Sequence, residues 1–464
     1  MQVNLPASEE TIAAISTPPG AGGIGIIRMS GKLALHILKG LFRPKDQGCS
    51  FVSHRLYYGH ICHPQGGKIV DEVLAVYMAA PRTYTREDVV EIHCHGSFLV
   101  LQNVLELILA GGAVLAAPGE FTKRAFLNGR IDLTRAEAVI DILSAKTRKG
   151  VDLAQEQLSG ALYRKIDPIR QSLIRMRALV EVAIDFPDED VEIVDHRQLI
   201  EQMALKVATP LKNLLGNAER GKVYREGVAI VIAGLPNVGK SSLLNALLQE
   251  ERALVTAIPG TTRDSIEEII DIFGVPVRII DTAGIRDDAG EVEELGIQRA
   301  RELINKADLV VFLIDGSREV TEGDQRLYQQ VQHKHLLLVI NKIDICGENR
   351  PDLSTLKGIG HCSAISAKNQ LGIDELKQAL FKAVTSGSEQ WEEGGCVPNF
   401  RHKQALMAAQ QSCERVLASL QMHVTNDLIA VDLQDCLDQL AEIVGETTTD
   451  DILDVIFAEF CLGK

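Results

Sequence analysis

The 464-residue chain lacks the sequence features of a secreted or membrane-embedded protein. Its nine cysteines show no disulfide-like spacing. Residues 1–20 have neither the charged-then-apolar pattern of a secretory signal nor the Arg-rich, acid-poor pattern of a transit peptide. No apolar run reaches the roughly 20 residues that a membrane-spanning helix needs. We therefore expect a protein of the reducing cytoplasm.

Basic residues are not in excess, and the chain has no internal repeat and no low-complexity segment. Its net charge of −15 argues against a surface coated with the Lys and Arg that neutralise nucleic-acid phosphates, although a local basic groove is compatible with it. The length suffices for roughly two to four domains, each with its own core.

A phosphate-binding loop is the clearest motif that is present. Gly234, Gly239, Lys240 and Ser241 fit the P-loop pattern G-x-x-x-x-G-K-S, and the apolar run 228–233 predicts the strand that must precede it. Glycines let backbone N–H groups curl around phosphates at the N-terminus of the next helix. Lys240 adds a cation, and the Ser241 hydroxyl can coordinate magnesium.

Four further motifs follow in the order of a guanine-nucleotide switch. Thr262 is placed to sense the γ-phosphate, and Asp281, after an apolar strand, can hold the water shell of the metal. Asp344 can accept two hydrogen bonds from guanine, a donor pair that adenine lacks, and the loop 366–368 backs the base. The predicted GTP site comprises Asn237, Val238, Gly239, Lys240, Ser241, Ser242, Thr256, Ala257, Ile258, Pro259, Gly260, Thr261, Thr262, Asp281, Thr282, Ala283, Gly284, Asn341, Lys342, Asp344, Ser366, Ala367 and Lys368.

Hydrolysis needs a group that orients the attacking water. Many small GTPases use a Gln after Asp-x-x-Gly, but Ile285 stands there and cannot do this. Glu293, in the acidic stretch 287–294, is the candidate we favour over a purely solvated acidic loop. No arginine is marked as a finger for the transition state, although Arg263 and Arg286 are near enough in sequence to be considered.

The periodicity of apolar residues changes three times along the chain, between strand-like and helix-like regions. It predicts the fold class: a multidomain protein with an α+β N-terminal domain, a helical bundle and an inserted Ras-like P-loop GTPase domain with a doubly wound sheet. Short apolar strands are predicted at 11–15, 25–29, 72–78 and 88–93, with a helix at 98–109; amphipathic helices are predicted at 135–147, 166–184, 403–421, 427–444 and 450–460. The predicted domains are 1–125, a first helical part 126–222, the GTPase domain 223–385 and a second helical part 386–464.

Two patterns outside the switch favour unremarkable interpretations. Gly20, Gly22 and Gly25 satisfy G-x-G-x-x-G, but a strand-like run follows them where a dinucleotide fingerprint needs a helix, so we expect a tight turn between strands. The runs His60 to His63 and His93 to His95 have zinc-ligand residue types without convincing spacing, and in a strand Cys94 would face away from its two histidines.

Seven runs along the chain together carry a resemblance to a known family. They are Asn237-Val-Gly-Lys-Ser241, Gly260-Thr-Thr-Arg-Asp264, Asp281-Thr-Ala-Gly-Ile285, Pro118-Gly-Glu-Phe121, Arg124-Ala-Phe-Leu-Asn128, Ala183-Ile-Asp-Phe-Pro-Asp188 and Cys461-Leu-Gly-Lys464. Through them the whole chain resembles the bacterial tRNA-modification GTPase family MnmE, also called TrmE. The resemblance implies a homodimer that works with an FAD-dependent partner of the MnmG (GidA) type on the wobble uridine of certain tRNAs.

The same resemblance implies the cofactors GTP, Mg²⁺, K⁺ and a 5-formyl- or methylene-tetrahydrofolate. It gives Glu293 the water-orienting role. It also makes Cys461 a required residue, although the bare sequence, which puts this thiol at a helix C-terminus, favours a buried structural cysteine. The implied ligands are Asn237, Thr256, Ile258 and Thr261 for K⁺, Ser241 and Thr262 for Mg²⁺, and Arg28, Glu91, Arg130 and Lys464 for the folate.

Two alternatives stay open at this point. The switch motifs are equally typical of a regulatory or ribosome-assembly GTPase that binds RNA and performs no modification. Residues 1–130 could instead form a folate-dependent one-carbon transferase that the switch regulates.

Overall fold

A computed structural model of the chain describes residues 10–46, 48, 50–186, 195–251, 267–280, 302–346, 351–356, 362–385, 396–461 and 463. The chain divides into two compact units, which we describe separately. Unit 1 comprises Met1–Ile140, Tyr163–Met203 and Gln411–Lys464, and unit 2 comprises Asp141–Leu162 and Ala204–Gln410. The four predicted domain ranges stay predictions.

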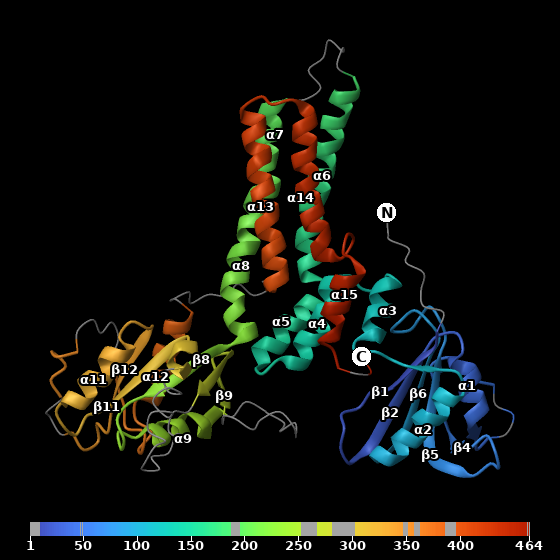
Figure 1. Ribbon diagram of the computed structural model, residues 1–464, viewed down its shortest axis with the longest axis horizontal. Helices are drawn as coiled ribbons and strands as arrows, with labels where there is room; N and C mark the ends of the chain where they lie inside the picture. Colours follow the sequence, from blue (N-terminus) through green and yellow to red (C-terminus); the bar gives the residue numbers. More distant parts are fainter. Residues whose placement is uncertain are drawn as a thin grey trace. The chain divides into compact units, whose positions relative to one another are not determined.

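Unit 1 contains a seven-stranded sheet in the order β3-β4-β5-β6-β2-β1-β7, antiparallel except for the β1–β7 pair. The sheet alternates: Val90, Ile92 and Cys94 face the core, and Glu91 and His93 face the other side. Helices α1 and α2 cover the core face (Figure 1). The elements are β1 Ile12–Ile15, β2 Gly22–Ser30, α1 Ala34–Leu41, β3 Phe42–Pro44, β4 Arg55–Cys62, β5 Ile69–Met78, β6 Val89–Gly96, α2 Phe98–Ala110 and β7 Val114–Leu115.

The G-x-G-x-x-G pattern lies mostly inside a strand. Gly22 and Gly25 belong to β2, which runs on to Ser30, and only Gly20 lies in the turn after β1. The predicted strand after these glycines is present. The turn before it is shorter than expected, because β2 already begins at the exposed Gly22, which pairs with Gly96 of β6.

The remaining helices of unit 1 pack on one another through polar pairs and a small aromatic core. Arg177 of α6 bonds to Gln434 of α14, and Arg415 of α13 contacts Asp432 of α14 at 3.2 Å. Leu133 of α4 and Phe457 of α15 share a core. Helices that lie wholly or partly in this unit are α3 Glu120–Leu127, α4 Leu133–Ser144, α6 Ala161–Asp185, α7 His196–Met203, α13 Phe400–Gln421, α14 Asn426–Val444 and α15 Asp450–Ala458.

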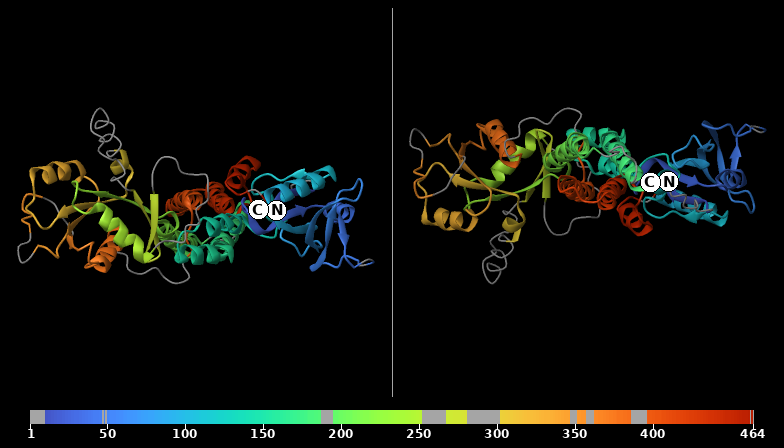
Figure 2. Two further views of the ribbon diagram at one scale, coloured as in Figure 1. Left: turned by 90° about the horizontal axis from the view of Figure 1, so that it is seen from below. Right: turned by 90° about the horizontal axis from the view of Figure 1, so that it is seen from above.

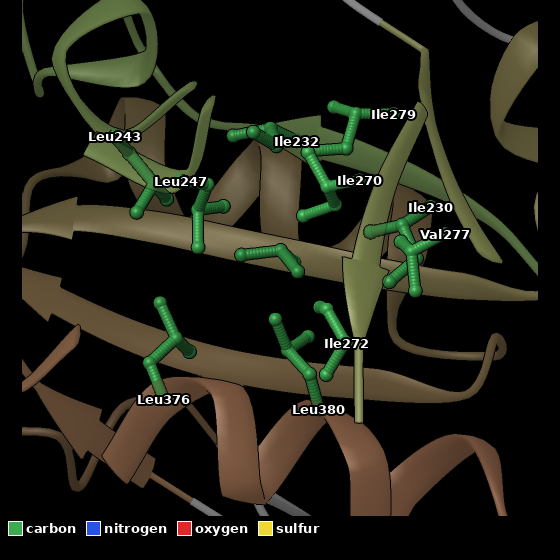
Figure 3. A pocket seen from close by; sticks show the side chains of 11 residues that line it. Ile230, Ile232, Leu243, Leu247, Ile270, Ile272, Val277, Ile279, Leu376 and Leu380 are labelled. Atoms are coloured by element: carbon green, nitrogen blue, oxygen red, sulfur yellow. The ribbon is translucent and has the colours of Figure 1, made fainter. Parts of the chain in front are cut away.

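Unit 2 is built on a six-stranded sheet in the order β13-β12-β11-β8-β10-β9, parallel except for the edge strand β9. The central strands β8 and β11 are apolar and buried on both faces, as a doubly wound sheet requires. Helices α9 and α12 cover one face and α11 the other (Figure 2). The aliphatic side chains between the sheet and α9 and α12 line a small pocket without a polar group (Figure 3).

The bounds in unit 2 show how each strand leads into a predicted motif. Strand β8 ends directly before the P-loop, and β12 ends at Asn341. The elements are α5 Arg148–Leu158, the π-helical turn η1 Ala204–Ala208, α8 Thr209–Glu226, β8 Val228–Ala233, α9 Lys240–Glu251, β9 Glu267–Ile272, β10 Val275–Ile280, β11 Leu309–Asp315, α11 Glu322–Val331, β12 Leu336–Asn341, β13 Cys362–Ala364 and α12 Ile373–Val384. Together the two units confirm the predicted fold class.

Each passage of the chain between the units falls within helical backbone. The passages lie inside α4, α6 and α13 and at the junction of α7 with η1. One predicted helix, 135–147, was too long: α4 ends at Ser144 because Thr147 begins α5, its hydroxyl accepting a hydrogen bond from Gly150 N at 3.1 Å.

Candidate functional site

The P-loop runs from a buried strand into a helix N-terminus, as the motif predicted. Gly239 has φ +99°, and a Cβ there would lie 2.2 Å from Asn341 Nδ2, so only glycine fits. Lys240 Nζ donates to Gly234 O at 2.8 Å and Leu235 O at 3.1 Å, which holds the ammonium across the loop. The N–H groups at the start of α9 and this cation suit an anionic phosphate.

Asn341 joins the P-loop to the base-side loop. Its side chain is 3% exposed, its Nδ2 donates to Val238 O at 2.8 Å, and its Oδ1 accepts from Ala367 N at 3.0 Å. Three stretches that are far apart in sequence, around Val238, Asn341 and Ala367, are therefore fixed to one another by one amide. Asp344 is exposed beside them, as a carboxylate that recognises a base must be.

Asp315 forms an ion pair with Lys342 of the predicted GTP site, and the sequence analysis did not predict this role. Lys342, with φ +66°, places its Nζ 2.6 Å from Asp315 Oδ2 at the end of β11. Burial by itself would raise the pKa of Asp315, but hydrogen bonds from Lys342 and Ser317 outweigh it and lower that pKa. The sequence did carry a signal for Asp315: this carboxylate ends the apolar strand β11, which pairs with the strand that leads into the N-K-x-D motif.

The remaining predicted GTP-site residues on the described chain lie in the same two loops or the first turn of α9; they are Asn237, Ser241, Ser242, Ser366 and Lys368. Several other predicted residues lie outside the residues that the structure describes. They are Thr256, Ala257, Ile258, Pro259, Gly260, Thr261, Thr262, Arg263, Asp281, Thr282, Ala283, Gly284, Ile285, Arg286, Glu293 and Lys464.

A second cluster lies in unit 1 on the open face of the seven-stranded sheet. Arg28 and Glu91 are register partners on β2 and β6, and Arg28 Nε donates to Glu91 Oε1 at 2.8 Å. Arg28 Nη1 also donates to Gly463 O at 3.2 Å, and the Ser16 hydroxyl donates to the same carbonyl at 3.1 Å. The C-terminal motif therefore lies against β1 and β2, although no sequence signal marked Ser16.

Cys461 is exposed, so the interpretation from bare sequence as a buried structural cysteine was wrong. The reason is that α15 ends at Ala458, before the predicted end at residue 460, and the chain then turns to place Cys461 O 3.5 Å from Gly119 N. The thiol thus lies between the end of α15 and the Gly463 contact with Arg28.

Arg130 is held by contacts with Tyr84. Its guanidinium lies 4.7 Å from the centre of the Tyr84 ring, and its Nη1 donates to Tyr84 O at 3.0 Å. The Tyr84 hydroxyl is 3.0 Å from Thr122 Oγ1 on α3. Of the four implied folate ligands, the structure thus pairs Arg28 with Glu91 and ties Arg130 to α3, while Lys464 is not described.

The two His/Cys runs do not form a metal centre among the described residues, where no group of three His, Cys, Asp or Glu side chains converges. Cys94 lies on the opposite face of β6 from His93 and His95, as predicted, and it is buried in the core. Burial, followed by the charge of Asp71, raises the pKa of Cys94 to about 12. His95 instead bonds through Nδ1 to Asp71 Oδ1 at 2.6 Å.

Known proteins match nearly the whole length of the chain, including both clusters. A family model described as "MnmE helical domain" matches residues 133–461, and one described as "GTP-binding protein TrmE N-terminus" matches residues 11–130. A tRNA modification GTPase MnmE of Desulfotalea psychrophila is 60% identical over 463 residues, covering 99% of each chain. That of Alkaliphilus oremlandii is 46% identical over 461 residues, covering 98% of this chain and 99% of the relative. Among the described residues, no helix is long and apolar enough to span a bilayer.

Proposed function

This chain belongs to the MnmE family of tRNA modification GTPases, and we propose that it uses GTP hydrolysis to help add a carboxymethylaminomethyl or aminomethyl group to C5 of the wobble uridine in certain tRNAs. As a member of that family it is a GTP hydrolase that takes part in tRNA modification. The site of chemistry in this proposal is the cluster around Arg28, Glu91 and Cys461, and the P-loop domain is the switch.

The observation that carries the proposal is the contact between the tail and the N-terminal sheet. Gly463 O accepts hydrogen bonds from Arg28 and Ser16, which brings the exposed Cys461 toward the Arg28–Glu91 pair. A purely regulatory GTPase has no need of this arrangement. The contact between the tail and the sheet therefore favours modification chemistry over the regulatory or ribosome-assembly alternative.

The residues of this cluster suit a tetrahydrofolate donor. Arg28 offers a cation to the glutamate carboxylates, and Glu91 offers an acceptor to the N–H groups of the ring. We place Arg130 and Lys464 in the same ligand set. A bound folate of the 5-formyl or methylene type would supply the one-carbon unit, while these side chains orient it.

For the switch, we propose magnesium at Ser241 and Thr262 and potassium at Asn237, Thr256, Ile258 and Thr261, with Glu293 orienting the attacking water. A fixed monovalent cation beside the developing phosphoryl charge would serve where an arginine finger serves elsewhere. Two copies of the chain would pair through their GTPase domains, and an FAD-dependent partner of the MnmG type would supply the redox chemistry.

The test is nucleoside mass spectrometry of tRNA from cells whose only copy carries Cys461→Ser. We expect the modified wobble uridine to disappear while the purified variant hydrolyses GTP at the rate of the unaltered chain. If tRNA is unchanged both in this variant and in a full deletion, the chain does not modify tRNA and its switch reports to another partner. Absence of folate binding to the unaltered protein would separately exclude the one-carbon transferase alternative.

A further inference from the structure

Helix α3 and the residue that precedes it contact both parts of the proposed reaction site, the Arg28 side chain and the Cys461 tail. At its N-terminus, Gly119 has φ +67°, and a Cβ there would lie 2.7 Å from Phe457 O of α15. One turn later, Lys123 Nζ is 2.5 Å from Asp454 Oδ1 of the same helix. Together with the contact of Gly119 N and Cys461 O, these place α3 against the element that carries the Cys461 tail.

The same helix also supports the side chains that we propose for the donor. Phe121 is fully buried, and its ring centre is 5.7 Å from the Arg28 guanidinium carbon. Thr122 contacts the Tyr84 hydroxyl, and Tyr84 in turn carries Arg130. A shift of α3 would therefore move the surroundings of Arg28 and of Cys461 at the same time.

A buried ionic network holds α3 in this place. Arg124, whose side chain is 6% exposed, donates from Nη1 to Glu10 O at 2.8 Å and to Glu87 Oε2 at 3.1 Å, and from Nη2 to Glu120 Oε1 at 2.9 Å. Glu87 Oε2 also accepts from the Ser30 hydroxyl of β2 at 2.7 Å. Removing the guanidinium would leave the Glu87 carboxylate, largely buried, without its counter-charge.

We propose that Arg124 is a positioning residue for the modification reaction: it fixes α3, and α3 sets the places of Arg28 and of the Cys461 tail. The inference rests on the proposed function of the Arg28–Glu91 cluster as the donor site. Arg124 would act through these residues and not by touching the donor itself.

The decisive experiment is a double-mutant cycle on donor affinity. The dissociation constant of 5-formyl-tetrahydrofolate is measured by calorimetry for the unaltered protein, Arg124→Met, Arg28→Met and the double variant. We expect each single change to weaken binding about tenfold and the double change to weaken it by much less than the product of the two, because Arg124 acts partly through Arg28. A full product, or unchanged affinity in Arg124→Met, overturns the proposal.

Two further variants sharpen the cycle. Arg82→Met removes an exposed arginine of the same unit and should leave the affinity unchanged. If Arg124→Met fails to fold, Glu87→Gln takes its place, because it keeps an acceptor for Ser30 and removes only the charge opposite Arg124.

A second readout separates this inference from the donor assignment. If the unaltered protein binds no folate, the proposed donor site is wrong, and amide hydrogen exchange then decides the role of Arg124. If amides over 453–461 exchange faster in Arg124→Met than in the unaltered chain, while those of α2 exchange equally in both, Arg124 positions the tail. Unchanged exchange over 453–461 overturns it.

Discussion

Asn341 shows at the scale of a single residue how two loops become one nucleotide site. Its amide satisfies both Val238 O and Ala367 N in a buried setting. Asn341→Ala should leave both groups unpaired, cost about 1–3 kcal/mol, and weaken GDP binding roughly tenfold or more. Titration with a fluorescent GDP analogue measures this. Asn369→Ala, an exposed change in the same base-side loop, is the control and should bind like the unaltered chain.

His95 gives a prediction about pH at the same scale. Its hydrogen bond to Asp71, then the negative charge of Asp71, raise the pKa of His95 above the ordinary 6.5. The protonated form is favoured on folding, so its stabilising contribution is complete below the unfolded pKa and is lost as pH rises through the higher folded pKa. His95 is exposed, and the effect on total stability is therefore small.

Asp71→Asn should return the pKa of His95 toward 6.5. Histidine-labelled NMR titration follows it directly. Glu72→Gln serves as the comparison, because Glu72 is the smallest of the contributions to this pKa and its loss should lower the value much less. An equal pKa in Asp71→Asn and the unaltered chain would contradict this account.

At the scale of elements, the hairpin of β9 and β10 joins, along the chain, the two predicted segments that contain Thr262 and Asp281. Strand β9 begins at Glu267, after the predicted Thr262 segment, and β10 ends at Ile280, directly before Asp281. The turn of this hairpin is held by α5, because the Thr147 hydroxyl donates to Gly274 O at 2.9 Å while it caps the helix. Thr147 is thus shared between a helix start and a strand turn.

Thr147→Val should remove both interactions and lower the local unfolding free energy of the first turn of α5 by about 1–2 kcal/mol. Hydrogen exchange of the amides at the start of α5 measures the loss. Thr147→Ser keeps the hydroxyl and should lose much less. Similar protection in the Val and Ser variants would show that the cap and the bond to the turn contribute little.

The sequence predicted elements with strong periodicity and missed those whose partners are distant in the chain. Helices α2, α13 and α14 follow the predicted ranges closely because their apolar positions repeat with the helix. Strand β4 was missed because it leaves Leu56 and Tyr58 partly exposed, which blurs the alternation. The P-loop could be read from local motifs, whereas the Arg28–Glu91 pair depends on the register of two strands 63 positions apart.

At the scale of the whole molecule, the proposed pairing of two GTPase domains predicts a dependence on the monovalent cation. Replacing K⁺ by Na⁺ at equal ionic strength should slow GTP turnover sharply, roughly tenfold or more, because the smaller ion fits a K⁺ cage poorly. Phosphate release measures the rate. Equal rates in the two salts would remove the ion from the mechanism.

Asn237→Gly is the matched variant for that experiment. Asn237 has φ +64°, which glycine adopts without strain, so the change removes the amide oxygen and keeps the loop. The variant should be slow in both salts and should no longer distinguish them. A preserved preference for K⁺ would mean that Asn237 is not among its ligands.

The interleaving of the two units along the chain has a consequence for how the protein is made. All of unit 2 precedes residue 411, whereas unit 1 needs Gln411–Lys464 to supply α14, α15 and the tail. On the ribosome, the nucleotide-binding part therefore emerges in full before Phe457 can join Leu133 in its core. A chain that stopped near residue 410 would keep its complete nucleotide motifs and have no Cys461. Cys461, which the proposed modification requires, is therefore translated only after the whole of unit 2.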